Sequence, residues 1–132
     1  MWLTVIQDEE PASGEAPELI WHWRKFSYEN QPIPENKYTK WFDYDKIEAG
    51  LNVRERRPGD FLVVNASGGR KKLKDYLIDC KVPRHERDRI PLLADGSHIV
   101  WAVGYRISEY YKVTHETKTV LEVRVEGGIQ HE

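Results

Sequence analysis

The segment from residue 51 to residue 91 limits the possible folds more than any other part of the chain. It opens with a strand-like run that ends at Pro58-Gly59-Asp60, and it resumes as an apolar run over residues 61–64. Proline and glycine interrupt regular structure, so both runs are expected to be short strands. After a glycine-containing turn over residues 65–69, residues 70–79 are amphipathic and predict a helix. The segment therefore predicts short strands that lead into a short helix.

Positive charge is concentrated in the same segment. Residues 51–91 hold eleven Lys and Arg against six Asp and Glu, although the whole chain has a formal net charge of -2. This distribution predicts one cationic face on an otherwise acidic protein. Cations also fill four of the first five positions of the expected helix, namely Arg70, Lys71, Lys72 and Lys74. Because a helix N-terminus already carries positive dipole charge, this arrangement favours a bound anion, and a phosphate is the expected ligand.

The rest of the chain predicts short strands joined by turns. Strands are expected over residues 2–6, 19–28, 38–42 and 118–125, with a hairpin in which residues 92–94 and 98–103 flank an Asp95-Gly96 turn. Two more short helices are expected over residues 46–49, capped by a preceding aspartate, and over residues 84–89, with an Arg84–Asp88 pair. Leu73, Tyr76 and Leu77 share one helical face and should dock on the sheet. The predicted class is α+β, β-rich with two or three short helices.

Catalytic chemistry finds little support in the sequence. The five histidines are scattered, and Ser67-Gly68-Gly69 lacks the spacing of a phosphate-binding P-loop. A single cysteine, Cys80, excludes an internal disulfide framework. A helix cap explains Asp43 and Asp45 better than a metal site does. We expect no catalytic residue, metal or cofactor in this chain; a free-standing enzyme that uses Asp43, Asp45 or Cys80 is the alternative. Without a signal-peptide pattern or a membrane-spanning run, the chain is expected to be soluble and cytoplasmic.

Basic side chains of the central segment are the candidate binding residues. Those expected to contact a phosphate backbone are first Arg70, Lys71, Lys72 and Lys74, and then Arg54, Arg56, Arg57, Arg84 and Arg87. Gly68 and Gly69 would let the backbone approach such a ligand closely. A solvated charged face explains the same residues without any ligand. A protein–protein interaction module that docks on an acidic surface is the alternative function.

Six ordered motifs resemble one known family. They are WFDYDKI at 41–47, VRxRRPGD at 53–60, GGxKKLKD at 68–75, KVPRxERDxIP at 81–91, IVWxVGxRI at 99–107 and TK at 117–118. Together they resemble the C-terminal domain of bacterial tRNA(Ile)-lysidine synthase from about residue 38 to residue 125. The resemblance implies a substrate-binding domain over residues 38–126, preceded by an approach segment with a β-hairpin over residues 1–37 and followed by a tail over residues 127–132.

The resemblance also implies a function. The family's enzyme uses ATP, with Mg expected beside it, to join lysine to the wobble cytidine of an isoleucine tRNA in the cytoplasm. Its catalytic loop belongs to an N-terminal domain that this chain lacks. The chain is therefore expected to hold the acceptor-stem end of the tRNA. The implied partners are tRNA, above all tRNA(Ile), and the catalytic domain, but no DNA and no membrane. The implied fold is sandwich-like and similar to a domain of phenylalanyl-tRNA synthetase.

Overall fold

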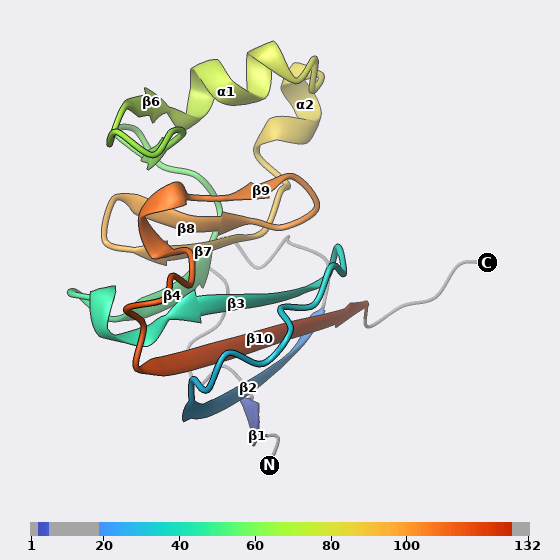
Figure 1. Ribbon diagram of the computed structural model, residues 1–132. Helices are drawn as coiled ribbons and strands as arrows, with labels where there is room; N and C mark the ends of the chain where they lie inside the picture. The colour runs from blue at the N-terminus through green and yellow to red at the C-terminus, as the bar shows by residue number, and fades with distance from the viewer. Residues whose placement is uncertain (1–2, 6–18, 128–132) are drawn as a thin grey trace.

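Three layers stack on one another in this computed structural model, which describes residues 3–5 and 19–127 (Figure 1). A four-stranded sheet forms the first layer and a six-stranded sheet the second. The helices α1 (Leu73–Asp79) and α2 (Arg84–Arg87) form the third layer, at the top of the view. The turn of the β-hairpin expected over residues 1–37 lies outside the described residues. None of the described helices is long and apolar enough to span a membrane.

The first sheet is antiparallel, in the order β1-β2-β10-β3. Its strands are β1 (Leu3–Val5), β2 (Leu19–Ser27), β3 (Thr39–Asp43) and β10 (Thr119–Gly127). These bounds confirm the four predicted strands to within two residues. Strand β2 pairs with β10 along its whole length, from the Gly127–Leu19 pair to the Thr119–Ser27 pair. Residues before position 38 therefore supply an inner strand to the same sheet, and the division at residue 38 stays a prediction from the resemblance.

The second sheet is mixed, in the order β4-β7-β8-β5-β6, with β9 (Arg106–Ile107) also on β8. Its other strands are β4 (Leu51–Arg54), β5 (Phe61–Val63), β6 (Arg70–Lys72), β7 (Leu92–Asp95) and β8 (His98–Ala102). The β7–β8 hairpin about Asp95-Gly96 confirms the predicted turn. Strand β5 runs parallel to β8 and antiparallel to β6, which makes β6 an edge strand.

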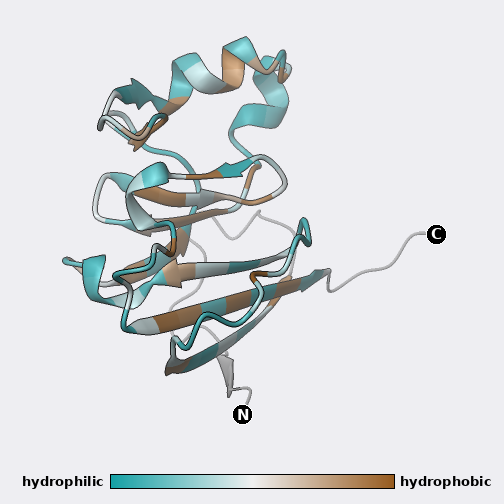
Figure 2. Ribbon diagram, viewed as in Figure 1, coloured by the Kyte–Doolittle hydropathy of each residue, from teal (hydrophilic) through white to brown (hydrophobic). Residues whose placement is uncertain are grey.

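Two hydrophobic clusters hold the layers together, and the second sheet separates them. Phe42, Trp101 and Val123 belong to the cluster between the two sheets, whereas Leu62, Leu77 and Ile99 belong to the cluster under α1. Strands covered on both faces need apolar residues at every position, which explains the unbroken apolar runs of β7 and β8. The register between these strands shifts at Leu93/Ala94, where β8 inserts one extra residue. Figure 2 shows brown bands along β10 and the β7–β8 region, while β6, α1 and α2 are mostly teal.

The helices differ most from expectation. The predicted helix over residues 70–79 begins only at Leu73, because residues 70–72 form β6 and pair with β5. Leu73 and Leu77 are buried and Tyr76 packs beside them, which confirms the predicted docking face. The helix expected at 46–49 is instead a 3-10 turn, η1 (Tyr44–Lys46), in which the Asp43 carboxylate accepts from the Asp45 backbone N–H. A second 3-10 turn, η2 (Glu109–Tyr111), lies between β9 and β10. The α+β class is confirmed.

Candidate nucleic-acid interface

The first run of cations, residues 54–57, is largely built into the fold. Arg54 is 5% exposed and donates through Nη1 and Nη2 to the two carboxylate oxygens of Asp60, both at 2.9 Å. The same guanidinium donates to the backbone carbonyls of Glu55 and Gly96, at 2.9 and 2.8 Å. A buried guanidinium with this many acceptors cannot also reach a phosphate at the surface, so the prediction that Arg54 contacts phosphate does not fit its position.

Arg56 and Arg57 are adjacent in the chain, but the first is paired and the second is exposed. Arg56 Nε donates to Asp88 Oδ1 at 2.7 Å, which ties the turn after β4 to the end of α2. Asp88 is thus paired with Arg56, and the expected Arg84–Asp88 pair is wrong. The side chain of Arg57 is exposed, while its backbone N–H donates to the Asp60 carboxylate at 2.7 Å and its carbonyl accepts from the Asp60 backbone N–H at 3.2 Å. Of the first run, only Arg57 therefore offers its charge to solvent.

The second run of cations begins on the edge strand β6. Lys71 is paired with Leu62 of β5 and forms an ion pair with Asp79 at the end of α1. Because side chains alternate along a strand, Arg70 and Lys72 point to the opposite face of β6. Only Lys74 lies in the first turn of α1, where Asp75 accompanies it. The expectation that four cations open a helix is therefore wrong, and with it the argument for a phosphate at a helix N-terminus.

The remaining predicted residues divide between exposed and structural roles. Arg84 is exposed at the start of α2, whereas Arg87 is half-buried and donates through Nε to the Val82 carbonyl at 3.1 Å. Gly68 has a φ of +92° in the β5–β6 turn. A Cβ on Gly69 would lie 2.6 Å from the Asn65 amide nitrogen, while the Gly69 backbone N–H donates to Asn65 Oδ1 at 2.8 Å. Both glycines are accounted for by the turn itself.

A set of unpaired cations remains on the two helices, on β6 and on the turn beside the start of α1. The Leu73 backbone N–H donates to the Asp60 carbonyl at 2.9 Å, which places the turn that carries Arg57 against the start of α1. Four exposed basic residues lie around this contact or at the start of α2. We call them the cationic surface: Arg57, Lys72, Lys74 and Arg84. None of them forms an ion pair with any described residue, in contrast to Lys71 and Arg56. The cationic surface is thus free to bind an external anion.

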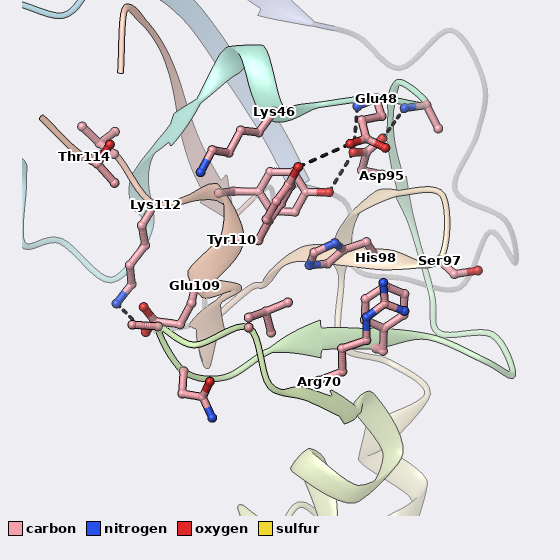
Figure 3. Close-up of a pocket in the computed structure, with 18 residues that line it drawn as sticks. Lys46, Glu48, Arg70, Asp95, Ser97, His98, Glu109, Tyr110, Lys112 and Thr114 are labelled. Carbon is pink, nitrogen blue, oxygen red and sulfur yellow. Dashed lines mark hydrogen bonds and ion pairs between the residues drawn. The ribbon is translucent and has the colours of Figure 1, made fainter. Parts of the chain in front are cut away.

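A cleft of about 780 Å³ opens on the face of β5 and β6 toward which Arg70 points. Its walls come from η1 and the loop after it, from β5, β6 and the turn between them, from the β7–β8 turn, and from η2 and the residues that follow it (Figure 3). Three rings form a row along it. The ring centroids of Phe61 and His98 are 4.6 Å apart, and those of His98 and Tyr110 are 5.4 Å apart. Cations cover both ends of the row: the Arg70 guanidinium lies 4.2 Å from the Phe61 centroid and Lys46 Nζ lies 5.0 Å from the Tyr110 centroid.

Buried hydrogen bonds fix the walls of the cleft. The Asp95 carboxylate accepts from the backbone N–H groups of Glu48 and Ala49 at 2.9 and 2.6 Å and from the Tyr111 hydroxyl at 2.7 Å. Three segments of the chain therefore meet at one carboxylate. Burial and this hydrogen bond raise the pKa of the Tyr111 hydroxyl above its ordinary range. The tyrosine thus stays a hydrogen-bond donor at neutral pH.

His98 is held as a neutral ring. The Ser108 hydroxyl oxygen accepts from the Val63 backbone N–H at 2.9 Å and lies 2.8 Å from His98 Nε2. A hydroxyl can accept one hydrogen bond and still donate its own hydrogen, so Ser108 can donate to Nε2 of an uncharged imidazole. Burial lowers the pKa of His98 to about 4, against an opposing effect of Asp95. At neutral pH the row therefore consists of three uncharged rings between two cations.

The sequence reasoning missed this cleft. Phe61 was assigned only to a strand, His98 only to a hairpin and Lys46 only to a helix. The adjacent tyrosines at 110 and 111, in an otherwise polar stretch, were the one local signal that could have drawn attention to it. Of the two carboxylates weighed as a metal pair, that of Asp43 has a structural role, since it caps η1 and its other oxygen accepts from the Thr117 hydroxyl at 3.1 Å. Among the described residues, no group of three or more His, Cys, Asp or Glu is arranged to hold a metal ion.

Comparison with known proteins identifies the family. The sequence model described as the TilS substrate C-terminal domain matches residues 51–125, which is more than half of the chain. The chain belongs to this family, and the resemblance seen in the sequence is confirmed.

The individual matches agree with this assignment. The tRNA(Ile)-lysidine synthase of Clostridium tetani is 45% identical over 95 residues, which cover 72% of this chain and 20% of that protein. The enzyme of the same name from Caldanaerobacter subterraneus is 51% identical over 87 residues, covering 66% and 19%. The chain thus spans about a fifth of the length of these curated relatives. A crystal structure described as a TILS C-terminal domain superimposes with a TM-score of 0.65 at 25% identity, covering 98% of both chains.

Proposed function

We propose that this chain is the tRNA-recognition domain of a tRNA(Ile)-lysidine synthase, and that it holds the acceptor-stem end of the tRNA while another domain performs the chemistry. The observation that carries this proposal is the cationic surface. Arg57, Lys72, Lys74 and Arg84 keep their charges exposed and unpaired among the described residues, although neighbouring cations of the same segment are paired. Exposed, unpaired cations are the groups that neutralise nucleic-acid phosphates.

The chemistry of the cationic surface suits the outside of an RNA helix. The deep, narrow major groove of A-form RNA keeps side chains from its base edges, so proteins recognise duplex RNA mostly through phosphates, 2′-hydroxyls and overall shape. Lysine and arginine side chains on a layer of two short helices can follow a phosphate backbone without reading bases. The proposed role is therefore to position the stem rather than to read its sequence.

The wider reaction belongs to the same proposal. ATP-dependent ligation of lysine to the wobble cytidine of tRNA(Ile) would take place in a catalytic domain, with ATP and Mg bound there, in the cytoplasm. The partners of this chain would then be the tRNA and that catalytic domain. The chain itself contributes affinity and orientation, which raise the effective concentration of the tRNA at the catalytic centre.

A titration over a series of salt concentrations tests the proposal. The chain is titrated with tRNA(Ile), with a second tRNA and with duplex DNA, first unaltered and then as the Lys72→Ala/Lys74→Ala double variant. We expect tRNA affinity to fall steeply with salt, and the double variant to show a slope smaller by about two, one for each lost phosphate contact. Lys37→Ala/Lys118→Ala is the matched control, because both lysines are exposed and lie next to strands of the first sheet; it should leave the slope unchanged.

Two results would overturn the proposal. If no tRNA binds even at low salt, the cationic surface has another partner, and an acidic protein surface is the alternative to test next. If the double variant and its control lose affinity equally, the binding reflects total charge and not the cationic surface. Equal affinity for duplex DNA would remove the RNA preference while leaving the phosphate contacts in place.

A further inference from the structure

The cleft beside the cationic surface has the chemistry of a nucleotide site. We propose that it binds one unpaired nucleotide of the RNA, with the base against the Phe61–His98–Tyr110 ring row and its two flanking phosphates each beside one of the cations at the ends of the row. This inference rests on the proposed function, because it assigns a second contact to the same RNA. It concerns the single-stranded end that adjoins the stem, whereas the cationic surface concerns the stem itself.

The ring row supplies a stacking surface. Successive centroids at 4.6 and 5.4 Å lie within the range in which aromatic rings interact, and the ring planes of each pair are tilted by only 31° and 34°. Tyr110 is 38% exposed, so its ring can be reached from the cleft. A single-stranded base can stack on such a surface, whereas a paired base inside a duplex cannot reach it. The cleft therefore favours an unpaired nucleotide over a duplex.

The charges around the row favour a phosphate. Of the three carboxylates that line the cleft, Glu109 is paired with the cations Arg106 and Lys112 at 3.1 and 2.8 Å. Asp95 and Glu48 keep their negative charges, but each is held by neutral donors: Asp95 accepts three hydrogen bonds, and Glu48 faces the Tyr110 hydroxyl at 3.3 Å. Arg70 and Lys46 have no carboxylate partner among the described residues, and each lies over a ring. Two cations therefore remain for an anion that enters with a planar ring.

The cleft is continuous with the cationic surface. Arg70 and Lys72 are two residues apart on β6 and point to the same face, so their attachment points are separated by about 7 Å along the strand. Arg70 belongs to the cleft and Lys72 to the cationic surface. One RNA strand can therefore leave the stem on the cationic surface and place its next, unpaired nucleotide in the cleft. A volume of about 780 Å³ leaves room for it, since ligand sites usually measure roughly 300–1,000 Å³.

Three RNA hairpins of acceptor-stem length test the inference with the whole chain of 132 residues. The first is blunt, the second carries a four-nucleotide single strand at its 3′ end, and the third carries the same single strand with its bases removed. We expect the intact single strand to strengthen binding by about tenfold, and the strand without bases to lose that gain, since one stacked base contributes at this level. Fluorescence anisotropy of labelled hairpins gives the three dissociation constants.

Variants locate the effect in the cleft. Tyr110→Leu should remove the tenfold gain from the single strand while leaving affinity for the blunt hairpin unchanged. Tyr105→Leu is the matched control, because Tyr105 is 42% exposed and does not line the cleft; it should keep the gain. If Tyr110→Leu does not fold, Lys46→Gln gives the same test, and it should weaken binding of the intact single strand only and reduce its salt slope by about one.

The outcomes separate this inference from the proposed function. If the blunt and the single-stranded hairpins bind equally, or if Tyr110→Leu weakens both to the same extent, the cleft holds no nucleotide and the inference is overturned. The cationic surface would then still account for binding. If neither hairpin binds at low salt, the proposed function fails first. If removing the bases does not matter, the cleft binds phosphate alone and the stacking part is wrong.

Discussion

The two runs of cations in the central segment are similar in sequence but differ in how far the fold pairs their charges. Residues 54–57 and residues 70–74 each contain several Lys and Arg in close succession. In the first run Arg54 is buried and Arg56 is paired, so that its charges hold turns and layers together. In the second run Arg70, Lys72 and Lys74 are exposed, and of these cations only Lys71 is paired with an acidic side chain in the part of the chain that the structure describes. A cluster of charge therefore stays exposed only where the fold supplies no internal partner.

The position of nearby carboxylates explains the difference. Asp60 follows Arg54 by six residues, and the turn through Pro58 and Gly59 brings its carboxylate back onto the guanidinium at 2.9 Å. Strand β6 has Asn65, Ser67 and glycines before it, and no carboxylate in its turn. Among the described residues, its ion pair is the one between Lys71 and Asp79, on the face opposite Arg70 and Lys72. Chain geometry thus pairs most of the first run and leaves most of the second exposed.

The largest expected effect comes from breaking the buried pair. Arg54→Met would leave the Asp60 carboxylate buried without its cation, and removal of one partner from a buried pair costs about 3–5 kcal/mol of unfolding free energy. Urea unfolding measures this loss. Arg57→Met, in the same run but exposed, should change the unfolding free energy by less than about 0.5 kcal/mol.

The double variant Arg54→Met/Asp60→Leu sharpens this test. Replacing both charges removes the uncompensated carboxylate, so a large part of the lost stability should return. Arg54→Met that is no more destabilising than Arg57→Met would show that the two runs do not differ as the structure indicates.

A smaller effect is expected from protonating His98, whose ring lies near Arg70 of the second run. The pKa of His98 is about 4 in the folded chain, against 6.5 ordinarily, mainly through burial and partly through Arg70. The neutral ring therefore stabilises the folded state fully above pH 6.5, and this contribution is lost as pH falls from about 6.5 to about 4. The full shift corresponds to roughly 3 kcal/mol.

Urea unfolding between pH 7.5 and pH 4.5 measures this dependence. His98→Gln should lose less stability over the range than the unaltered chain. The variant lacks the imidazole that takes up a proton when the chain unfolds at low pH. His115→Gln, at a histidine whose side chain is 89% exposed, is the control and should keep the original dependence. Parallel curves for all three chains would mean that His98 is not held neutral.

Local patterns made much of the fold predictable. The β7–β8 hairpin follows from two apolar runs about an Asp-Gly turn, and the docking face of α1 follows from helical spacing of Leu73, Tyr76 and Leu77. The start of α1 was mispredicted because residues 70–72 have no local feature that distinguishes a helix from a strand. Pairing with β5 decides their conformation, and that pairing is a property of the folded sheet.

The candidate site was predictable only in part. The sequence indicated a cationic segment, but which of its charges are exposed depends on partners such as Asp60, Asp79 and Asp88. The cleft depends on contacts between distant residues: Phe61 meets His98 through the parallel β5–β8 pair, and Tyr110 joins them from η2. Parallel pairing of strands that are far apart in the chain has no short-range sequence signal, so the ring row could not be predicted.

The smallest expected effect concerns the one paired cation of the second run. Lys71 and Asp79 form an ion pair, but their side chains are 36% and 60% exposed. Water and salt screen such a pair, so a double-mutant cycle of Lys71→Ala and Asp79→Ala should give a coupling of about 0.2–1 kcal/mol. A coupling as large as the loss from Arg54→Met would contradict the comparison. Because Lys71 faces α1 rather than the cleft, we also expect Lys71→Ala to weaken tRNA binding less than Lys72→Ala does, and the same salt titrations measure that difference.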